Sequence, residues 1–537
     1  MANPNSYYPR VNFKPEPNVF EFMRKRCIDF WNEVAVIDAE TGREWTFASV
    51  LSRVCQLRDF LRRNGVCTGD RVAVYAFNSL ESYASVWALA SLPAQVVLIR
   101  PIFKYREVSS ILEISKCPVV ITDRAHLNTV LGIQRAVSSL QTILLTDDSD
   151  TPIPSIAKLF MTSPDAFSYP DPETHDHSDD TAFMIPTSGT AGNSKLVEHT
   201  HRSFLSSFYV TAPHVRMLHN HDVVLMSSSI SHVTGLWALG GCMHQGIKCV
   251  VPRLASLPTF ELFRDTCDRF KVSTFLTFPT VFRNILLTAT GNPVASVTNI
   301  MCGGSRSPPG LGELLRRWFP NLCHVRQLLG QTEVMVYVSI TPENETDLQT
   351  IGHPPSNCAI RIQNMDTGEE NGAGEIGEIV VQSPCLMKGY FQNPDETRAA
   401  FTEDGWMRTG DLGYLDPERR RFCFVNRIQE VITCKDNRLY PGELERVLAE
   451  HPAVADAAVI GIPHADLGEA PAALIELRPS VQASEVLRAE LGNLIEIQFA
   501  PYKRLSGGVH FVESLPRTDL NKVVRRKLKD LLPNGIF

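Results

Sequence analysis

The sequence has no long uninterrupted apolar run, no closely spaced cysteine pair and no excess of positive charge. Its two most apolar stretches, Val86–Ile99 and Val223–Val251, are broken by polar residues, so neither is predicted to cross a membrane as a helix. The 13 cysteines are scattered from Cys27 to Cys434 without a C-x-x-C pair. This spacing predicts neither a disulfide framework nor a zinc finger, and it favours reduced, mostly buried thiols.

Charge and the two ends of the sequence exclude further classes of function. With 52 Lys and Arg against 59 Asp and Glu, the net charge is −7, which gives no general reason to bind nucleic acid or an anionic membrane. Residues Met1–Phe30 lack the continuous apolar core of a secretory signal, and Asn534–Phe537 do not match a Ser-Lys-Leu peroxisomal address. We therefore expect a cytoplasmic protein that holds any anionic ligand locally.

What the sequence does contain is the composition of a large globular protein. Its 537 residues are 44% hydrophobic and 21% charged, which is enough for two or more domains with packed cores. From Trp45 to about Phe270, helical and strand patterns alternate, and this rhythm predicts an α/β fold. The predicted helices of this part are Ser49–Asn64 and Leu80–Leu92, and the predicted strands are Arg71–Tyr75, Val96–Ile99, Pro118–Thr122 and Thr142–Thr146.

The remaining parts of the chain do not show this alternation of helices and strands. Asp147–Asp180 is rich in Pro, Ser, Asp and His and is predicted to be an exposed connector, whereas Gly352–Tyr414 is a glycine-rich β region. Beyond Arg427 the pattern predicts a compact α+β module of about 110 residues. Its predicted helices are Gly442–Glu450 and Ala483–Leu494, and its predicted strands are Ala455–Ile460 and Val509–Val512.

The segment Pro186–Lys195 has the composition of a phosphate-binding loop. Hydroxyls and glycines alternate in it and a lysine closes it, so backbone N–H groups, hydroxyls and one cation can all face a phosphate. Its G-x-x-G-x-x-K spacing is not that of P-loop NTPases, and a plain Ser/Gly turn remains open on composition alone. The residues expected to bind the nucleotide phosphates are Thr187, Ser188, Gly189, Thr190, Gly192 and Lys195.

Five further motifs follow in a fixed order along the chain. They are Gln331–Glu333 (QTE), Trp406–Asp411 (WMRTGD), Asn426–Arg427 (NR), Tyr440–Glu445 (YPGELE) and Pro516–Lys522 (PRTDLNK). Together with the phosphate loop they resemble the adenylate-forming enzymes, which include acyl-CoA synthetases, 4-coumarate–CoA ligases, firefly luciferase and the adenylation domains of peptide synthetases. The likeness covers nearly the whole chain.

The resemblance implies a reaction, its cofactors and a domain plan. In this family a carboxylic acid attacks the α-phosphorus of ATP to give an acyl-adenylate and pyrophosphate, and the acyl group then usually passes to a thiol such as coenzyme A. The implied ligands are ATP, Mg²⁺, coenzyme A and a small-molecule carboxylic acid. The implied architecture is a large α/β N-terminal domain (1–426) of several subdomains, with mixed sheets packed against helices, and a small α+β C-terminal domain (427–537) joined by a hinge.

The resemblance also assigns roles around the nucleotide. Thr332 and Glu333 are expected beside the phosphates, with Glu333 holding Mg²⁺, an ion that prefers hard oxygen ligands. Asp411 is expected to accept both ribose hydroxyls, and Gly304 and Ser305 to lie along the adenine and the acyl pocket, where missing side chains allow close approach. Taken alone, the Thr-Glu pair also suits a helix N-terminus, and Asp411 also suits a turn.

The resemblance places His232 at the entrance for the carboxylate, although a lone histidine in an apolar stretch is also typical of a packed core. No aspartate lies between Ser227 and Leu239 to pair with an α-ammonium, which favours a fatty or aryl acid over an amino acid. The flanking Val233, Leu236 and Trp237 fit an apolar substrate.

Two cations are expected to come from the C-terminal module or its junction. Lys522 is expected to bridge the carboxylate and the α-phosphate in the first half-reaction, where a flexible ammonium suits the developing negative charge. Arg427 is expected to contact ribose or phosphate. Without the resemblance, Lys522 reads as one charge of a solvated basic helix.

This sequence departs from the family pattern at four positions. Leu329 stands where an aromatic ring commonly stacks on adenine, and Gln429 stands at the pivot where Asp or Lys is common. Thr433 replaces a lysine and Asp436 replaces a glycine near the expected path of the thiol. Adenylation is therefore better supported than thioester formation, and transfer to a carrier protein, luciferase-type oxidation and a catalytically impaired binding protein remain alternatives.

Two other patterns are not predicted to be sites. Gly372–Gly377 spells G-x-G-x-x-G, but it leads into a strand at Glu378–Gln382 rather than into a helix, so it is predicted to be a β-turn. Five histidines lie close together in the sequence without a carboxylate or cysteine framework at ligand spacing, and they are predicted to lie on the surface. They are His199, His201, His214, His219 and His221.

Overall fold

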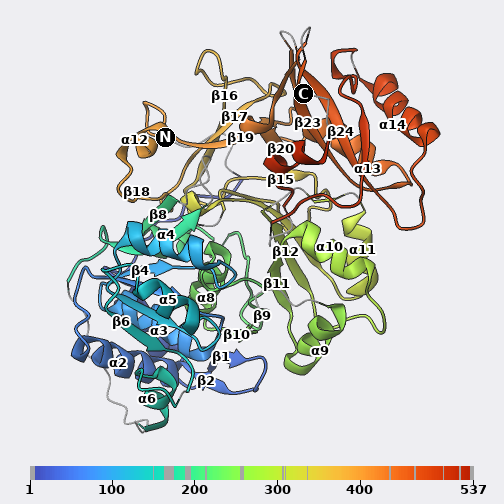
Figure 1. The fold of residues 1–537 in the computed structure, drawn as a ribbon. Coiled ribbons are helices and arrows are strands. Elements are labelled where there is room, and N and C mark those ends of the chain that lie inside the picture. The colour runs from blue at the N-terminus through green and yellow to red at the C-terminus, as the bar shows by residue number, and fades with distance from the viewer. Residues whose placement is uncertain are drawn as a thin grey trace.

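The protein is built on four β-sheets, three in the large N-terminal part and one in the C-terminal module (Figure 1). They are seen in a computed structural model that describes residues 7–148, 150–162, 175–187, 195–211, 214–253, 259–304, 307–308, 310–335, 337–434, 437–464, 467–499, 501–518 and 522–532.

The first large sheet has the strand order β18-β8-β7-β4-β3-β5-β6. Its central strands are parallel and covered on both faces, which is why their sequences are nearly continuous runs of Val, Ile and Leu rather than alternating patterns. The strands are β3 (Arg71–Tyr75), β4 (Gln95–Leu98), β5 (Val119–Thr122), β6 (Thr142–Leu145), β7 (Thr181–Thr187), β8 (Lys195–Thr200) and β18 (Gly389–Tyr390).

The second large sheet has the order β14-β13-β12-β11-β9-β10-β1-β2 and is parallel from β13 to β1. Parallel strands place their carboxyl ends at one edge, and loops at such an edge are the usual location of ligand sites in α/β folds. The strands are β1 (Val34–Asp38), β2 (Glu44–Thr46), β9 (Val223–Leu225), β10 (Lys248–Val251), β11 (Thr274–Thr277), β12 (Asn299–Gly303), β13 (His324–Leu329) and β14 (Ser339–Ile340).

Helices separate and cover these two sheets, so the layers alternate between helix and sheet. The largest apolar core joins α1, α2, α3, α7 and α8 between the sheets, while α4 and α5 cover the outer face of the first sheet and α9 to α11 cover that of the second. The helices are α1 (Val19–Asp29), α2 (Phe47–Arg63), α3 (Leu80–Ser91), α4 (Tyr105–Ser115), α5 (Leu127–Gln134), α6 (Ile156–Thr162), α7 (His201–Tyr209), α8 (Val233–Gln245), α9 (Phe260–Phe270), α10 (Pro279–Leu287) and α11 (Leu311–Trp318).

A third, antiparallel sheet and the C-terminal module lie above the two large sheets in Figure 1. The third sheet leads directly into the module through the short helix η2, so the end of β20 is also the junction. The third sheet contains β15 (Thr350–Gly352), β16 (Ala359–Gln363), β17 (Gly377–Gln382), β19 (Met407–Leu415) and β20 (Phe422–Arg427), and the nearby short helices are η1 (Thr332–Val334), α12 (Pro394–Ala399) and η2 (Ile428–Glu430).

The C-terminal module packs two helices on one face of a five-stranded sheet. A second apolar cluster covers the other face, where the last turns of the chain pack. The elements are β21 (Ile432–Cys434), β22 (Asn437–Leu439), α13 (Pro441–Glu450), β23 (Val454–His464), β24 (Gly468–Leu477), α14 (Glu485–Gln498), η3 (Pro501–Lys503), β25 (Val509–Val512), η4 (Arg525–Lys527) and η5 (Lys529–Leu531).

The predicted α/β class is confirmed, and the predicted helices and strands coincide with observed elements, although several boundaries shift. The G-x-G-x-x-G segment does lead into a strand, β17. The prediction of an exposed connector at Asp147–Asp180 is wrong in part, because α6 lies within it. Ile156 and Ala157 are buried, and Phe160 packs edge-on against Trp45. Strand β24, the long partner of β23, had no counterpart among the predicted elements.

All 13 cysteines are free, and most of them are buried. Among the described residues, none of the helices is both long enough and apolar enough to span a lipid bilayer.

A buried arginine holds three distant segments together beside β13. Arg326 is only 1% exposed, and its guanidinium donates to the carbonyls of Thr341 (2.9 Å) and Val215 (2.5 Å) and to the hydroxyl of Tyr8 (3.2 Å). Burying a cation is costly unless its donors are satisfied, so these acceptors and the arginine depend on one another. The N-terminal segment and the loop before β9 are thereby fixed to the second large sheet.

We expect Arg326→Met to destabilise the N-terminal domain by about 3 kcal/mol, because it leaves buried carbonyls without donors. The measurement is urea-induced unfolding followed by tryptophan fluorescence. Arg398→Met serves as the control, since Arg398 is exposed and, within the described part of the chain, its ion pair is with Asp395 one helical turn away. Its effect is expected within about 0.5 kcal/mol. Equal effects of the two substitutions would contradict the anchoring role.

Candidate active site

Asp411 and Arg427 face each other across strands β19 and β20. They are register partners in the antiparallel pair, and Arg427 Nε lies 2.7 Å from Asp411 Oδ1. Asp411 is only 3% exposed, and its Oδ1 receives no hydrogen bond from the described residues, because the arginine meets it outside hydrogen-bond geometry. A buried carboxylate oxygen without a hydrogen-bond donor is unfavourable, and here the charge of Arg427 compensates for its burial.

Lys522 reaches the same place from the C-terminal module. Two hydrogen bonds connect Lys522 to Thr518: Lys522 N donates to Thr518 Oγ1 (3.1 Å) and Thr518 N donates to Lys522 O (2.8 Å). The side chain of Lys522 is exposed, but it lies in a cleft where the surrounding protein partly desolvates it. The pKa of Lys522 is lowered by this desolvation and by the charge of Arg427, while Asp411 and Glu430 act in the opposite direction.

Burial changes the charge state of Asp411. Desolvation raises the pKa of Asp411 to about 6, against the attraction of Arg427 and Lys522, which lowers it. Asp411 therefore titrates close to neutral pH rather than near the ordinary value of 3.8.

His232 caps helix α8 at the other side of the cleft. Its Nδ1 accepts from Thr234 N and lies 2.7 Å from Thr234 Oγ1, which fixes the ring at the helix N-terminus. Burial lowers the pKa of His232 to about 3, and the charges of Arg100 and Lys522 act in the same direction, so the imidazole is neutral at pH 7. His232 is thus a partly buried residue that also belongs to the electrostatic surroundings of Lys522.

Phe278 connects His232 to Gly304. The rings of His232 and Phe278 meet edge to face at 5.8 Å, and a Cβ added to Gly304 would lie 2.8 Å from the Phe278 ring. Gly304 also has φ of +82°, a conformation that favours glycine. The backbone after β12 therefore comes close to this wall of the cleft because residue 304 has no side chain.

A second group of residues lies where β7, β8, β18 and η1 meet. Thr187 and Lys195 are register partners at the ends of β7 and β8. Lys195 Nζ lies 2.5 Å from Glu396 Oε2 and over the ring of Tyr390 at 5.0 Å, and Tyr390 donates to Glu333 Oε1 at 2.9 Å. The base of the predicted phosphate loop is therefore linked through one tyrosine to the predicted magnesium ligand.

Thr332 is held by its backbone. Its carbonyl lies 2.7 Å from His199 Nε2, and the cap position of η1 is Gln331, without a side-chain capping bond. The Thr-Glu pair is thus not a helix cap of the kind that the sequence alone allowed.

The structure brings Thr187, Lys195, His232, Gly304 and the motif residues of η1, the third sheet and the C-terminal module toward one region. The motif residues are Thr332, Glu333, Asp411, Arg427 and Lys522. Four predicted residues of the phosphate loop and one beside Gly304 lie outside the described residues. They are Ser188, Gly189, Thr190, Gly192 and Ser305.

The departures from the family pattern fall at different depths. Leu329 is partly buried and packs on the apolar core of the third sheet. Gln429 and Thr433 are exposed, and Thr433 N donates to Glu469 Oε2 at 2.8 Å. Asp436 lies outside the described residues. Of the three residues beside His232 that were expected to face the substrate, Val233 and Leu236 are buried in the core, whereas Trp237 lines two cavities.

Sequence reasoning missed Arg100, Phe278, Tyr390 and Glu430. Arg100 follows the carboxyl end of the parallel strand β4, a location that topology favours for ligand contacts, and this was the available signal. Burial lowers the pKa of Arg100 to about 10. The other three stand in no recognisable motif, and only the fold brings them to the cleft.

The predicted surface position is wrong for two of the five histidines. His199 and His201 are fully buried, and burial lowers the pKa of each to about 4. Their side chains lie under the start of α7, where His201 Nδ1 accepts from Val19 N. Within the described ranges, no three metal-ligating side chains gather in a metal-binding cluster.

Comparison with known proteins agrees with this architecture. The sequence profile described as "AMP-binding enzyme" matches residues 24–391, and the profile described as "AMP-binding enzyme C-terminal domain" matches residues 443–522. The chain therefore belongs to the AMP-binding family of adenylate-forming, acyl-activating enzymes. Membership in this family specifies neither the acid nor the acyl acceptor.

Relatives of known name cover the chain almost completely. Luciferin 4-monooxygenase of Nipponoluciola cruciata is 29% identical over 551 residues, with 100% of this chain and 98% of the relative covered. The 4-coumarate–CoA ligase-like 4 of Oryza sativa subsp. japonica is 29% identical over 524 residues, with 96% and 92% covered.

Solved structures share the fold. ATP-bound MatB from Rhodopseudomonas palustris superposes with a TM-score of 0.83 at 23% identity, covering 96% of this chain and 98% of MatB. MenE from Bacillus subtilis, in complex with its acyl-adenylate intermediate OSB-AMP, gives a TM-score of 0.79 at 26% identity, covering 96% of this chain and 99% of MenE.

The pKa of Asp411 generates a test of its contact with ribose. Because only the ionised carboxylate accepts from two hydroxyls, affinity for adenosine is expected to rise roughly tenfold from pH 5 to pH 7 as Asp411 ionises near pH 6. Calorimetric titration with adenosine is suitable, since this nucleoside has no phosphate that titrates in the same range.

Two variants complete this test. Asp411→Asn should remove the pH dependence, whereas Asp404→Asn should keep it, because its Arg361 partner holds the pKa of Asp404 at about 2. The stability of the ligand-free protein should depend on pH in the opposite direction. Because the pKa of Asp411 is about 6 in the folded protein and 3.8 ordinarily, the free energy of unfolding decreases as the pH rises from about 4 to 6. A flat adenosine affinity in the unsubstituted protein would contradict the assignment.

Proposed function

We propose that this protein uses ATP to activate a carboxylic acid and then transfers the acyl group to coenzyme A. In the first step the carboxylate oxygen forms a bond to the α-phosphorus of ATP and the bond to pyrophosphate breaks, giving an acyl-adenylate. In the second step the thiol attacks the acyl carbon, AMP leaves with the bonding electron pair, and the thiol proton is released. The observation that carries the proposal is the approach of Lys522 to Asp411, Arg427 and His232 in one cleft.

Each group of this cleft fits one part of that chemistry. Asp411 would accept the ribose hydroxyls and Arg427 would contact ribose or phosphate, while Gly304 and Ser305 would lie along the adenine and the acyl group. Lys522 would bridge the carboxylate and the α-phosphate, stabilising negative charge that develops in the transition state. The neutral His232, fixed by Thr234, would border the carboxylate entrance as a hydrogen-bonding group without charge.

The phosphates would lie between the β7–β8 loop and η1. Thr187, Lys195 and the loop residues Ser188, Gly189, Thr190 and Gly192 would supply donors, and Thr332 would lie beside them. Glu333 fits a Mg²⁺ ligand, since Tyr390 occupies one of its oxygens and the other accepts no hydrogen bond from the part of the chain described here. Bound there with phosphate oxygens, Mg²⁺ would neutralise charge on the leaving pyrophosphate.

The surroundings of His232 favour an acid without an α-ammonium. No acidic side chain lies from Ser227 to Leu239, and the small cavity behind His232 is lined largely by apolar groups such as Leu276, Ala238 and Met301. An ammonium placed there would be desolvated without a partner. A fatty or aryl acid therefore fits better than an amino acid.

Coenzyme A is proposed as the acceptor because several relatives are named CoA ligases. The luciferin monooxygenases among the relatives belong to the same family but are named for an oxidation rather than for transfer to a thiol. The acceptor therefore has to be tested separately from adenylation.

The test is exchange of labelled pyrophosphate into ATP, driven by a panel of fatty and aryl acids, followed by CoA-dependent release of AMP. Exchange and thioester formation together support the proposal. Pyrophosphate exchange without thioester formation would favour a different second step, either transfer of the acyl group to a carrier protein or an oxidation. ATP binding without exchange for any acid would contradict an enzymatic role and support a binding protein.

Lys522→Ala is expected to lower pyrophosphate exchange at least a hundredfold, because it removes a cation aimed at the reacting oxygens. Thiolysis of a supplied acyl-adenylate should be largely unaffected. Lys527→Ala, on the exposed helix η4, is the matched control and should retain both steps. Equal loss of both half-reactions in Lys522→Ala would show that its role has been misassigned.

A further inference from the structure

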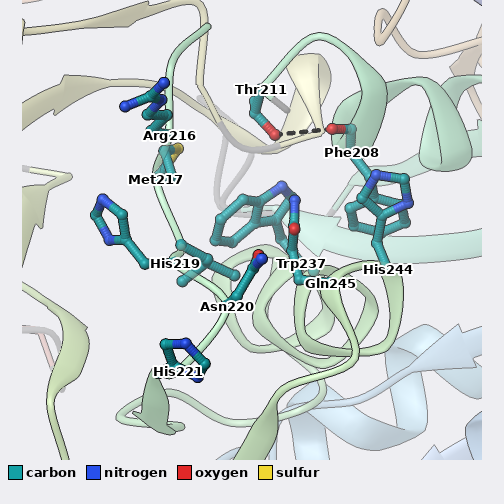
Figure 2. Close-up of a pocket in the computed structure, with 12 residues that line it drawn as sticks. Phe208, Thr211, Arg216, Met217, His219, Asn220, His221, Trp237, His244 and Gln245 are labelled. Carbon is teal, nitrogen blue, oxygen red and sulfur yellow. Dashed lines mark hydrogen bonds between the residues drawn. The ribbon is translucent and has the colours of Figure 1, made fainter. Parts of the chain in front are cut away.

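A cavity of about 430 Å³ lies beyond the candidate active site, between α7, the C-terminal half of α8 and the loop Arg216–His221 (Figure 2). Figure 2 shows Trp237 in the middle of its wall, with His244 on one side and Arg216 and His219 on the facing loop. None of the residues assigned above to nucleotide binding lines this cavity. We call it the distal cavity.

The distal cavity is in line with the carboxylate entrance at His232. A smaller, mainly apolar cavity is lined by Thr234 and Ala238 at the start of α8, and the two cavities share Trp237 and Leu218 as lining residues. Thr234, Ala238, Gly241 and Gln245 follow one another at helical spacing, so they lie along one face of α8. This face leads from His232 through the small cavity to the distal one.

The two cavities differ in what they can hold. The small one has a volume of about 10 Å³ and is bordered by Met301, whose flexible side chain can yield to a chain of methylenes but leaves no room for a ring system. The distal cavity is large and has a mixed wall. Its apolar floor includes Phe208 and Met217, and its rim carries Arg216, His219 and Asn220.

Two polar atoms in the distal wall have no partner in the described structure. Trp237 is 2% exposed and its indole Nε1–H donates to no acceptor among the described residues, and the same stretches provide no partner for His244 Nδ1. Both atoms are enclosed and have almost no accessible surface of their own, so they make the wall polar without offering a contact to a ligand. The guanidinium of Arg216 at the rim would favour an anionic oxygen of a ligand in the distal cavity.

The wall of the distal cavity is preformed. Arg326 donates to the carbonyl of Val215, Asn299 Nδ2 donates to the carbonyl of Met217 (3.1 Å), and His219 N donates to Asp222 Oδ2 (2.7 Å). The loop that closes the cavity is thus fixed by buried groups. Gly241 keeps the floor open, since a Cβ there would already lie 3.3 Å from Leu218 Cδ1.

We propose that the distal cavity binds the far end of the acid, and that the preferred substrate is an unbranched aliphatic acid with a second carboxylate at that end. This proposal rests on the adenylation proposed above. Gly241 lies nine positions after His232, which corresponds to about 13 Å along α8 at 1.5 Å per residue. An extended chain advances about 1.2 Å per bond, so this span corresponds to roughly ten to twelve carbons.

The first test compares kcat/KM for acid-dependent pyrophosphate exchange between two acids of equal length, a twelve-carbon α,ω-diacid and the twelve-carbon monoacid. The diacid should be favoured at least tenfold, and Arg216→Asn should lower this ratio about tenfold by removing the cation. Asparagine is chosen because residue 216 has φ of +47°, which asparagine tolerates. A diacid that is no better than the monoacid would overturn the proposal.

The second test narrows the distal cavity. Gly241→Leu should reduce kcat/KM for the twelve-carbon acids at least tenfold more than for butyrate, which cannot reach this depth. Gly492→Leu, a matched change in α14 where a Cβ meets no atom within 4 Å, should leave the ratio of long to short acids unaltered. An equal loss for long and short acids in Gly241→Leu would overturn the distal subsite.

The outcome also separates this inference from the proposed function. Exchange with butyrate but no discrimination by length or by the second carboxylate would overturn the subsite alone. Absence of exchange with every acid in the unsubstituted protein would overturn the proposed function and the subsite with it.

Discussion

The contact between Asp411 and Arg427 lies at the junction between the two parts of the molecule. Both residues belong to the third sheet, yet Arg427 is the last residue of β20 and is followed at once by the helix that enters the C-terminal module. Burial destabilises the charged form of Asp411, and the neighbouring cations compensate for this. The charge state of the cleft thus depends on the position of the module that supplies Lys522.

Several positively charged side chains meet in the cleft. Arg100, Arg427 and Lys522 all act on the same surroundings, and the carboxylates among them are Asp411 and Glu430. Burial also raises the pKa of Glu430, against the attraction of Arg525 and Arg427. Cations that are partly desolvated suit an anionic ligand, which would replace the lost hydration. The neutral His232 beside them adds a polar group without adding to the repulsion.

Much of the fold could be predicted from the sequence because the relevant signals are local. The buried strands β3 to β6 are short runs of Val, Ile and Leu, and α2 and α3 follow helical periodicity with clear caps at Thr46 and Ser79. Helix α6 was missed because its apolar residues are embedded in a segment dominated by Pro, Ser and Asp. Its burial depends on Trp45, which is distant in the sequence.

The candidate site divides in the same way. Asp411, Arg427 and Lys522 could be found because they stand in recognisable motifs, whereas Tyr390 and Phe278 could not. Their contacts with Glu333, His232 and Gly304 exist only after strands far apart in the sequence have been brought together. The histidines illustrate the same limit: His199 and His221 carry identical side chains, and only tertiary packing decides that the first is buried and the second exposed.

Arg525 connects the segment after the third sheet to the body of the C-terminal module. Its guanidinium contacts Glu430 Oε2 (3.0 Å), Glu445 Oε1 (2.7 Å) and the carbonyl of Val459 (2.7 Å), and so ties the end of η2 to α13 and β23. The chain from Glu430 onward is therefore bound to the body of the module, while Arg427 stays paired with the opposite strand. A hinge between the third sheet and the module would therefore comprise Ile428 and Gln429, and a rotation there would carry Lys522 out of the cleft while Arg427 remained in place.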